Sequence, residues 1–153
     1  MKTLLDDACR RELIDRLGLL RPDSARRWGR MSVHQMVCHL GDACRMMMGE
    51  QHVSVASGAM QRTLVKWIAL YAPVPWPPDI VTRPEIDQVL GAGTKPMDFA
   101  TDVAALQSML AAIKPRGNSP SWPDHPIFGP MSERAWFRWA YLHTDHHLRQ
   151  FGV

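Results

Sequence analysis

The segment "YLHTDHHLRQ", residues 141–150, holds three of the seven histidines in the chain. His143 and His147 are four positions apart, so on a helix both side chains lie on one face, one turn from each other. Two imidazoles in this arrangement can bind one metal ion. His146 falls about 60° from His143, on the side away from His147. We therefore expect His146 to flank the pair or to lie at the surface.

A further histidine, His39, lies on the apolar stripe of an earlier predicted helix. In a helical bundle, facing helices commonly contribute ligands to one site. Together with His143 and His147, His39 would leave one coordination position for water or substrate, as in catalytic zinc sites. The alternative is that these are hydrogen-bonded core histidines, and spacing alone does not decide between the two.

Asp42 follows His39 by three residues and is the candidate for a catalytic base near such a metal. A carboxylate in this position could also orient a ligand. The competing interpretation is a solvated aspartate paired with Arg45, its neighbour on the helix surface at spacing i+3.

Other polar residues near these positions have ordinary structural interpretations. Gln150, one turn past His147, can hydrogen-bond within the bundle or toward the site. His125, in "PDHPIFGP", is expected to lock a loop over Phe128 rather than to bind metal. Cys38 points about 100° away from His39, so it is a poor partner ligand and is expected to be a small buried hydrophobe.

Helix signals divide the chain into five predicted helices. A capping box of Ser32 with Gln35 starts the second helix, Asp98 caps the fourth and Ser132 caps the last. The expected spans are 4–19, 33–48, 59–71 and 99–113, followed by the helix after Ser132. In the third helix the apolar face consists of Leu64, Trp67, Ile68 and Tyr71.

The segment 72–95 contains five prolines, which exclude a long helix there. Its apolar side chains are expected to pack on the body of the protein: Val74, Trp76, Ile80 and Val81. No convincing pair of strands is present. The sequence therefore predicts an all-α bundle with an additional helix and a long proline-rich crossover.

The chain has 153 residues, enough for a single domain over 1–153. Its 46% hydrophobic and 22% charged residues are ordinary for a globular protein, and no apolar run is long enough to span a membrane. The start of the chain lacks the apolar core of a secretory signal, which favours a cytoplasmic location. Three cysteines without C-x-x-C spacing suit reduced thiols. The net charge of +3 does not favour nucleic-acid binding, because acidic residues are interleaved with the arginines.

The motif "HTDHHLRQ" resembles the terminal-helix motif of the DinB/YfiT-like superfamily of metalloenzymes. The pairing of "MSVHQMVCHLGDACRM" with "HPIFGPMSERAWFRWAYLHTDHHLRQFG" is similar to one bacterial branch of that superfamily. The resemblance implies an up-down-down-up four-helix bundle that binds a divalent metal through His39, His143 and His147.

The superfamily includes enzymes that transfer or use low-molecular-weight thiols. The resemblance therefore implies a metal-dependent enzyme, a thiol-dependent transferase or a hydrolase, acting on a small molecule that the sequence does not identify. Zinc or nickel is the expected ion by ligand softness. The alternative is a metal-binding or structural bundle without turnover. The six tryptophans and ten methionines, together with the resemblance, predict a homodimer.

Overall fold

The computed structural model describes residues 1–117 and 122–153. Residues 118–121, part of the loop predicted ahead of the last helix, lie outside the described residues. Over the described ranges the protein is helical and has no strand, which confirms the predicted all-α class. The five α-helices are α1 (Asp7–Leu17), α2 (Val33–Met48), α3 (Lys66–Tyr71), α4 (Phe99–Ala112) and α5 (Glu133–Gln150). None of the helices within these ranges is long and apolar enough to cross a membrane.

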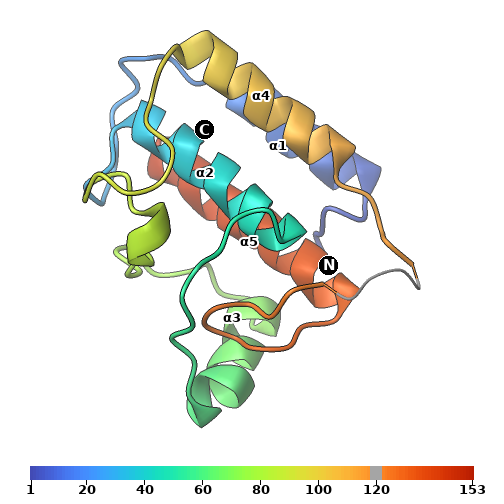
Figure 1. Ribbon diagram of the computed structural model, residues 1–153. Coiled ribbons are helices and arrows are strands. Elements are labelled where there is room, and N and C mark those ends of the chain that lie inside the picture. Colours follow the sequence, from blue (N-terminus) through green and yellow to red (C-terminus); the bar gives the residue numbers. More distant parts are fainter. Residues whose placement is uncertain (118–121) are drawn as a thin grey trace.

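The four longer helices form the bundle. Helix α4 packs against α1 and α2, and α5 packs against the same two helices from the other side (Figure 1). Side chains from all four helices are fully buried between them: Leu13, Leu17, Met36, Leu40, Met47, Leu106, Leu110, Trp136, Phe137 and Leu148. This arrangement agrees with a DinB-like helical bundle, while the up-down-down-up order of helix directions stays a prediction.

The helix starts are set by local side-chain hydrogen bonds, as predicted for α2, α4 and α5. Ser32 and Gln35 form the capping box of α2. Asp98 accepts a hydrogen bond from the Thr101 amide at the start of α4, and Ser132 caps α5 in the same way. The predicted span of the first helix was too long, because Asp6 accepts hydrogen bonds from the first amides of α1 and the helix ends before Gly18.

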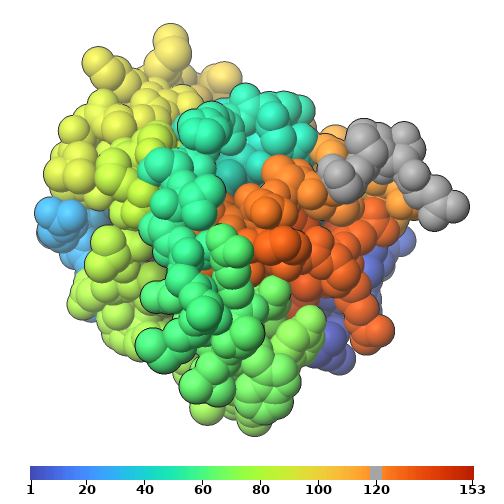
Figure 2. Space-filling model, turned by 60° about the horizontal axis from the view of Figure 1, so that its bottom comes forward, coloured from blue at the N-terminus to red at the C-terminus, as the bar shows by residue number. Residues whose placement is uncertain are grey.

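Helix α3 follows a π-helical turn, η1 (Gln61–Val65), and packs against α5. In Figure 2 this green segment lies across the face of the molecule beside the orange segment that leads into α5. The sequence predicted this helix, but the face that it assigned to the interior is not the buried one. Leu64, Trp67, Ile68 and Tyr71 are exposed, whereas Leu70 is buried and its carbonyl oxygen accepts a hydrogen bond from Arg138. Contacts with α5 therefore set the rotation of α3.

The proline-rich segment packs on the body less than predicted. Trp76 is half-buried against the core and donates a hydrogen bond to the Ala69 carbonyl oxygen. Val74, Ile80 and Val81 are exposed, Val81 to 85%, so the expectation for these three was wrong. Prolines prevent this stretch from forming a helix that could turn one apolar face inward. The segment crosses over a cavity and then forms a 3-10 turn, η2 (Pro84–Ile86), which packs on α2.

A buried carboxylate attaches the end of this segment to α2. Asp42 is fully buried, and its side chain accepts hydrogen bonds from Gln88 Nε2 at 2.6 Å, from the Thr94 amide at 2.8 Å and from Thr94 Oγ1 at 2.7 Å. Arg45 Nη2 lies 2.6 Å from the same carboxylate. The predicted pairing with Arg45 is confirmed, but Asp42 is not solvated.

Gly93 makes this close approach feasible. Its φ is +74°, and a Cβ atom there would lie 2.6 Å from Asp42 Oδ2 and 2.7 Å from Gln88 Nε2. Both the backbone conformation and the space therefore require glycine. The attached loop includes the residues directly after Ile86, so Asp42 also fixes the position of η2.

Replacing Asp42 by alanine should lower the free energy of unfolding by about 3 kcal/mol, because the buried Gln88 amide, Thr94 and Arg45 all lose their common acceptor. Replacing the helix cap Asp98 by alanine is the control and should cost clearly less, because this carboxylate is exposed to solvent. Urea denaturation of both variants measures the difference. Equal losses would contradict the structural role of Asp42.

Candidate metal centre

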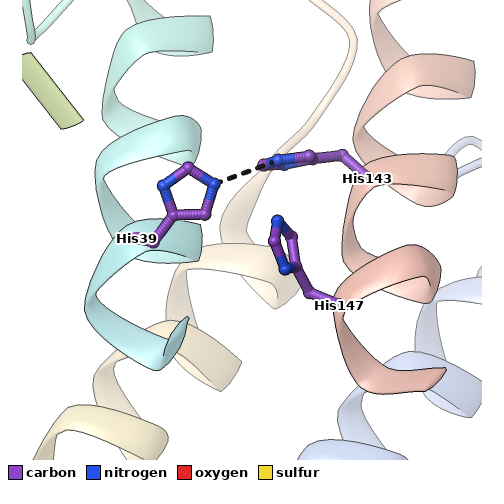
Figure 3. Close-up of side chains that lie close together, drawn as sticks. All are labelled: His39, His143 and His147. Carbon is purple, nitrogen blue, oxygen red and sulfur yellow. Dashed lines mark hydrogen bonds between the residues drawn. The ribbon is translucent and has the colours of Figure 1, made fainter. Parts of the chain in front are cut away.

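Three histidines from two helices meet at one point of the bundle. His39 projects from α2, and His143 and His147 project from α5 toward it (Figure 3). One ring nitrogen from each lies within 4.8 Å of the other two. His39 is buried, and the other two are half-buried. Residues about a hundred positions apart in the sequence are thus brought together.

The orientation of His39 is fixed by the proline-rich segment. Its Nδ1 lies 2.9 Å from the carbonyl oxygen of Ile86, in η2. A carbonyl oxygen only accepts hydrogen bonds, so Nδ1 carries the proton and donates it. The other ring nitrogen, Nε2, consequently presents a lone pair to the two histidines of α5.

A hydrogen bond likewise orients His147 and places its proton on Nδ1. Gln150 Nε2 donates to the Trp28 carbonyl oxygen at 2.8 Å, which leaves Gln150 Oε1 as an acceptor for His147 Nδ1 at 2.9 Å. His147 Nε2 is therefore also a lone-pair donor. Gly29 lets the chain pass close to Gln150, because its φ is +77° and a Cβ there would collide with Gln150 Nε2. Gln150 serves both roles considered from the sequence.

His143 completes the group. Its ring stacks on Trp139 with 4.8 Å between centroids and 14° between planes. Its Nε2 lies 3.2 Å from His39 Nε2. Two nitrogens bound tetrahedrally to one zinc ion are separated by about 3.3 Å, given bond lengths of about 2.0–2.1 Å. The observed separation therefore fits a shared ion.

The surroundings keep these imidazoles neutral. Burial lowers the pKa of His39 from its ordinary value of 6.5. Burial, followed by repulsion from the neighbouring imidazoles, lowers the pKa of His143 and His147 well below that value. A neutral imidazole is the form that binds metal, so the apolar surroundings favour ligation over protonation.

The three rings open onto a cavity of about 430 Å³. Its walls are largely apolar and come from α3, the proline-rich segment and the loop before α5. Trp76 and Ile68 are among the lining residues, so the exposed apolar side chains of these segments face this space in part. A small molecule in the cavity would reach the three histidines directly.

Of the two positions considered for His146, beside the pair or at the surface, the structure has the first. It is buried, its ring lies among Trp28, Trp76 and His147, and burial lowers its pKa to about 4. Its Nδ1 has no hydrogen-bond partner among the described residues. The helix phase was right, since His146 is outside the three-histidine group. Only the surface alternative was wrong, because the segments around Trp28 and Trp76 cover that side of α5.

His125 acts as the predicted loop lock. Its Nδ1 accepts hydrogen bonds from the amides of Ile127 and Phe128, both at 3.1 Å, and its ring stacks on Phe128 at 4.7 Å. The proton is therefore on Nε2, which is buried without a partner among the residues described. Burial lowers the pKa of His125 to about 3.

The residues around the group were identified only in part from the sequence. The backbone carbonyls of Ile86 and Trp28 carry no sequence signal, because any residue supplies one. The place of Trp139 beside His143 follows from helical spacing, since it precedes His143 by four positions on the same helix face. The role of Asp42 as a base stays a prediction, and its four polar contacts favour the structural role described above.

Fold and site together define a class, a helical bundle with a group of three histidines suited to a divalent metal. A comparison with protein families matches the DinB superfamily over residues 5–151, and the chain belongs to that superfamily. Comparisons with curated proteins and with solved structures found no match.

The lowered pKa of His125 predicts a pH dependence of stability. The folded state keeps the ring neutral down to about pH 3, whereas the unfolded ring takes up a proton below about 6.5. The contribution of His125 to the free energy of unfolding is therefore fully present above about pH 6.5 and is lost as the pH falls toward 3. Between pH 7.5 and 5.5, His125 should account for about 1 kcal/mol of lost unfolding free energy.

His125→Asn keeps an acceptor for the two loop amides and should make the pH slope shallower. Urea unfolding at both pH values in the presence of a chelator measures that slope. The exposed His52→Asn is the matched control and should leave it unchanged. An unchanged slope in His125→Asn would show that this ring is not kept neutral by burial.

Proposed function

We propose that this protein is a metal-dependent enzyme that binds a divalent ion through His39, His143 and His147. The observation that carries the proposal is that these histidines line the 430 Å³ cavity and that no fourth protein ligand joins them among the described residues. An ion with three protein ligands and access from a cavity retains a position for a substrate or nucleophile. Zinc or nickel suits three imidazoles.

The chain's own residues prepare this site in three ways. Ile86 and Gln150 fix two imidazoles with their lone pairs directed inward. The apolar walls exclude water and hold an apolar part of the substrate. When bound, a divalent ion lowers the pKa of a water or thiol at neutral pH. These features support a hydrolase or a thiol-dependent transferase acting on a small, largely apolar substrate.

The alternative is a helical bundle that binds metal without turnover. It requires the same three ligands, and the cavity argues against it because a purely structural site has a closed coordination shell.

We also propose a cytoplasmic location, supported by the three cysteines, all of which are free thiols.

Alanine at His39, His143 or His147 should abolish one equivalent of bound zinc, with a loss in affinity of more than about 100-fold. This bound follows because loss of an outer partner of a ligand already costs about 10–100-fold. Gln150→Leu removes such a partner and should fall within that range. Equilibrium dialysis of the chain without a histidine tag measures both.

Two controls separate ligation from general damage. His52→Ala replaces an exposed histidine, and Gln107→Leu removes a glutamine that bonds the Ile14 carbonyl oxygen. Both should bind zinc as the wild type does. The cobalt-loaded protein then tests the open position, since its visible spectrum should change when a small thiol is added, and this change should be smaller in His143→Ala. Zinc binding without a spectral response would favour the non-catalytic alternative.

We propose in addition that the protein forms a homodimer through the apolar surface of α3 and the following segment. The surface consists of Leu64, Trp67, Ile68, Tyr71 and Val74, all exposed. All five of these side chains are uncharged. A second copy of the same surface is therefore a better match than a charged partner.

Light scattering during size exclusion should give twice the 17.4 kDa mass of the chain at micromolar concentration. Trp67→Glu should give a single chain mass, because a charge at the centre of the apolar surface opposes its burial. Leu19→Glu changes an equally exposed apolar residue outside this surface and should leave the dimer intact. A wild-type mass of 17.4 kDa would contradict the proposal.

A further inference from the structure

A second group of potential metal ligands lies between α2 and α4, separate from the three histidines. His34 and Cys38 are four positions apart on α2, so both side chains lie on one face of that helix. Asp102, in the first turn of α4, faces them. One ligand atom from each of the three lies within 4.8 Å of the others.

The separations are close to those around a tetrahedral zinc ion. Cys38 Sγ lies 3.8 Å from Asp102 Oδ2, and His34 Nε2 lies 2.7 Å from the same oxygen. Zinc bond lengths to sulfur, nitrogen and oxygen place the ligand atoms about 3.4–3.6 Å apart. Shifts of about an ångström or less at the side-chain ends would therefore admit the ion.

Charge and access also suit a divalent cation. A neutral imidazole, a thiolate and a carboxylate carry two negative charges together, which balance one divalent ion. Cys38 is 4% exposed, whereas the side chains of His34 and Asp102 are 22% and 23% exposed, so solvent reaches the group from one side. Water can complete the coordination there.

The neighbours of the group hold its members in place. The Met97 amide donates a hydrogen bond to Asp102 Oδ2 at 3.1 Å, and the Phe99 ring contacts the His34 ring edge-on at 5.3 Å. Such outer contacts orient metal ligands. The competing interpretation is a simple pair of His34 with Asp102, with Cys38 as a bystander.

We propose that His34, Cys38 and Asp102 bind a zinc ion that joins α2 to α4. The mixed sulfur, nitrogen and oxygen donors favour zinc over the hard cations magnesium and calcium. The sulfur binds as a thiolate, and its displaced proton passes to the solvent. This site joins two helices and does not depend on the function proposed for the three histidines.

Cobalt titration of the metal-free full chain tests the site, because only a thiolate ligand gives cobalt charge-transfer absorption in the near ultraviolet. The wild type should show this absorption and bind two equivalents. Cys38→Ser should lose the absorption and one equivalent. Cys44→Ser, which changes another buried cysteine of α2, is the matched control and should keep both. His143→Ala should keep the absorption and lose the other equivalent.

Asp102→Asn keeps an acceptor for the Met97 amide and so preserves the local fold. It should weaken the affinity of the sulfur-containing site by at least about tenfold. The proposal is overturned if the wild type shows no charge-transfer absorption or if Cys38→Ser retains it. An unchanged cobalt affinity in Asp102→Asn would likewise overturn the three-ligand site.

Discussion

The hydrogen bond from His39 Nδ1 to the Ile86 carbonyl oxygen is the contact on which the candidate metal centre depends. It determines which nitrogen of a buried ring has the free lone pair, and hence what the ring can bind. A carbonyl can do this only if its peptide is held still. Asp42 provides that restraint, because it binds the chain just beyond Ile86 through Gln88 and Thr94. The proline-rich segment is therefore part of the site.

On the opposite side of the site, another histidine is also oriented by a hydrogen bond that an irregular segment holds in place. His147 is oriented by Gln150, which in turn is fixed by the Trp28 carbonyl oxygen in the segment before α2. The helices supply the rings, while irregular segments on both sides set their tautomers. A bundle of four helices alone would bring the histidines together without deciding whether they present lone pairs or protons to one another.

This division explains what could be predicted from the sequence. The ring positions follow from helical spacing and from caps such as Ser32, all of which are local features. The burial of His146 and the rotation of α3 were missed, because both depend on contacts with distant segments. The role of Asp42 was missed for the same reason. Every residue type has a backbone carbonyl, so the sequence does not indicate which carbonyl a histidine or glutamine will contact. The tautomers of the histidines therefore could not be predicted.

The tautomers also bear on whether the three histidines are merely core residues. If His143 carries its proton on Nε2, it can donate to His39 Nε2 across the 3.2 Å contact. His147 Nε2 then remains an acceptor without a hydrogen-bond partner among the described residues. One proton cannot satisfy two lone pairs, whereas one cation can bind all three nitrogens once His143 is protonated on Nδ1. The hydrogen bonds at Ile86 and Gln150 thus favour an ion as the common partner of the three rings.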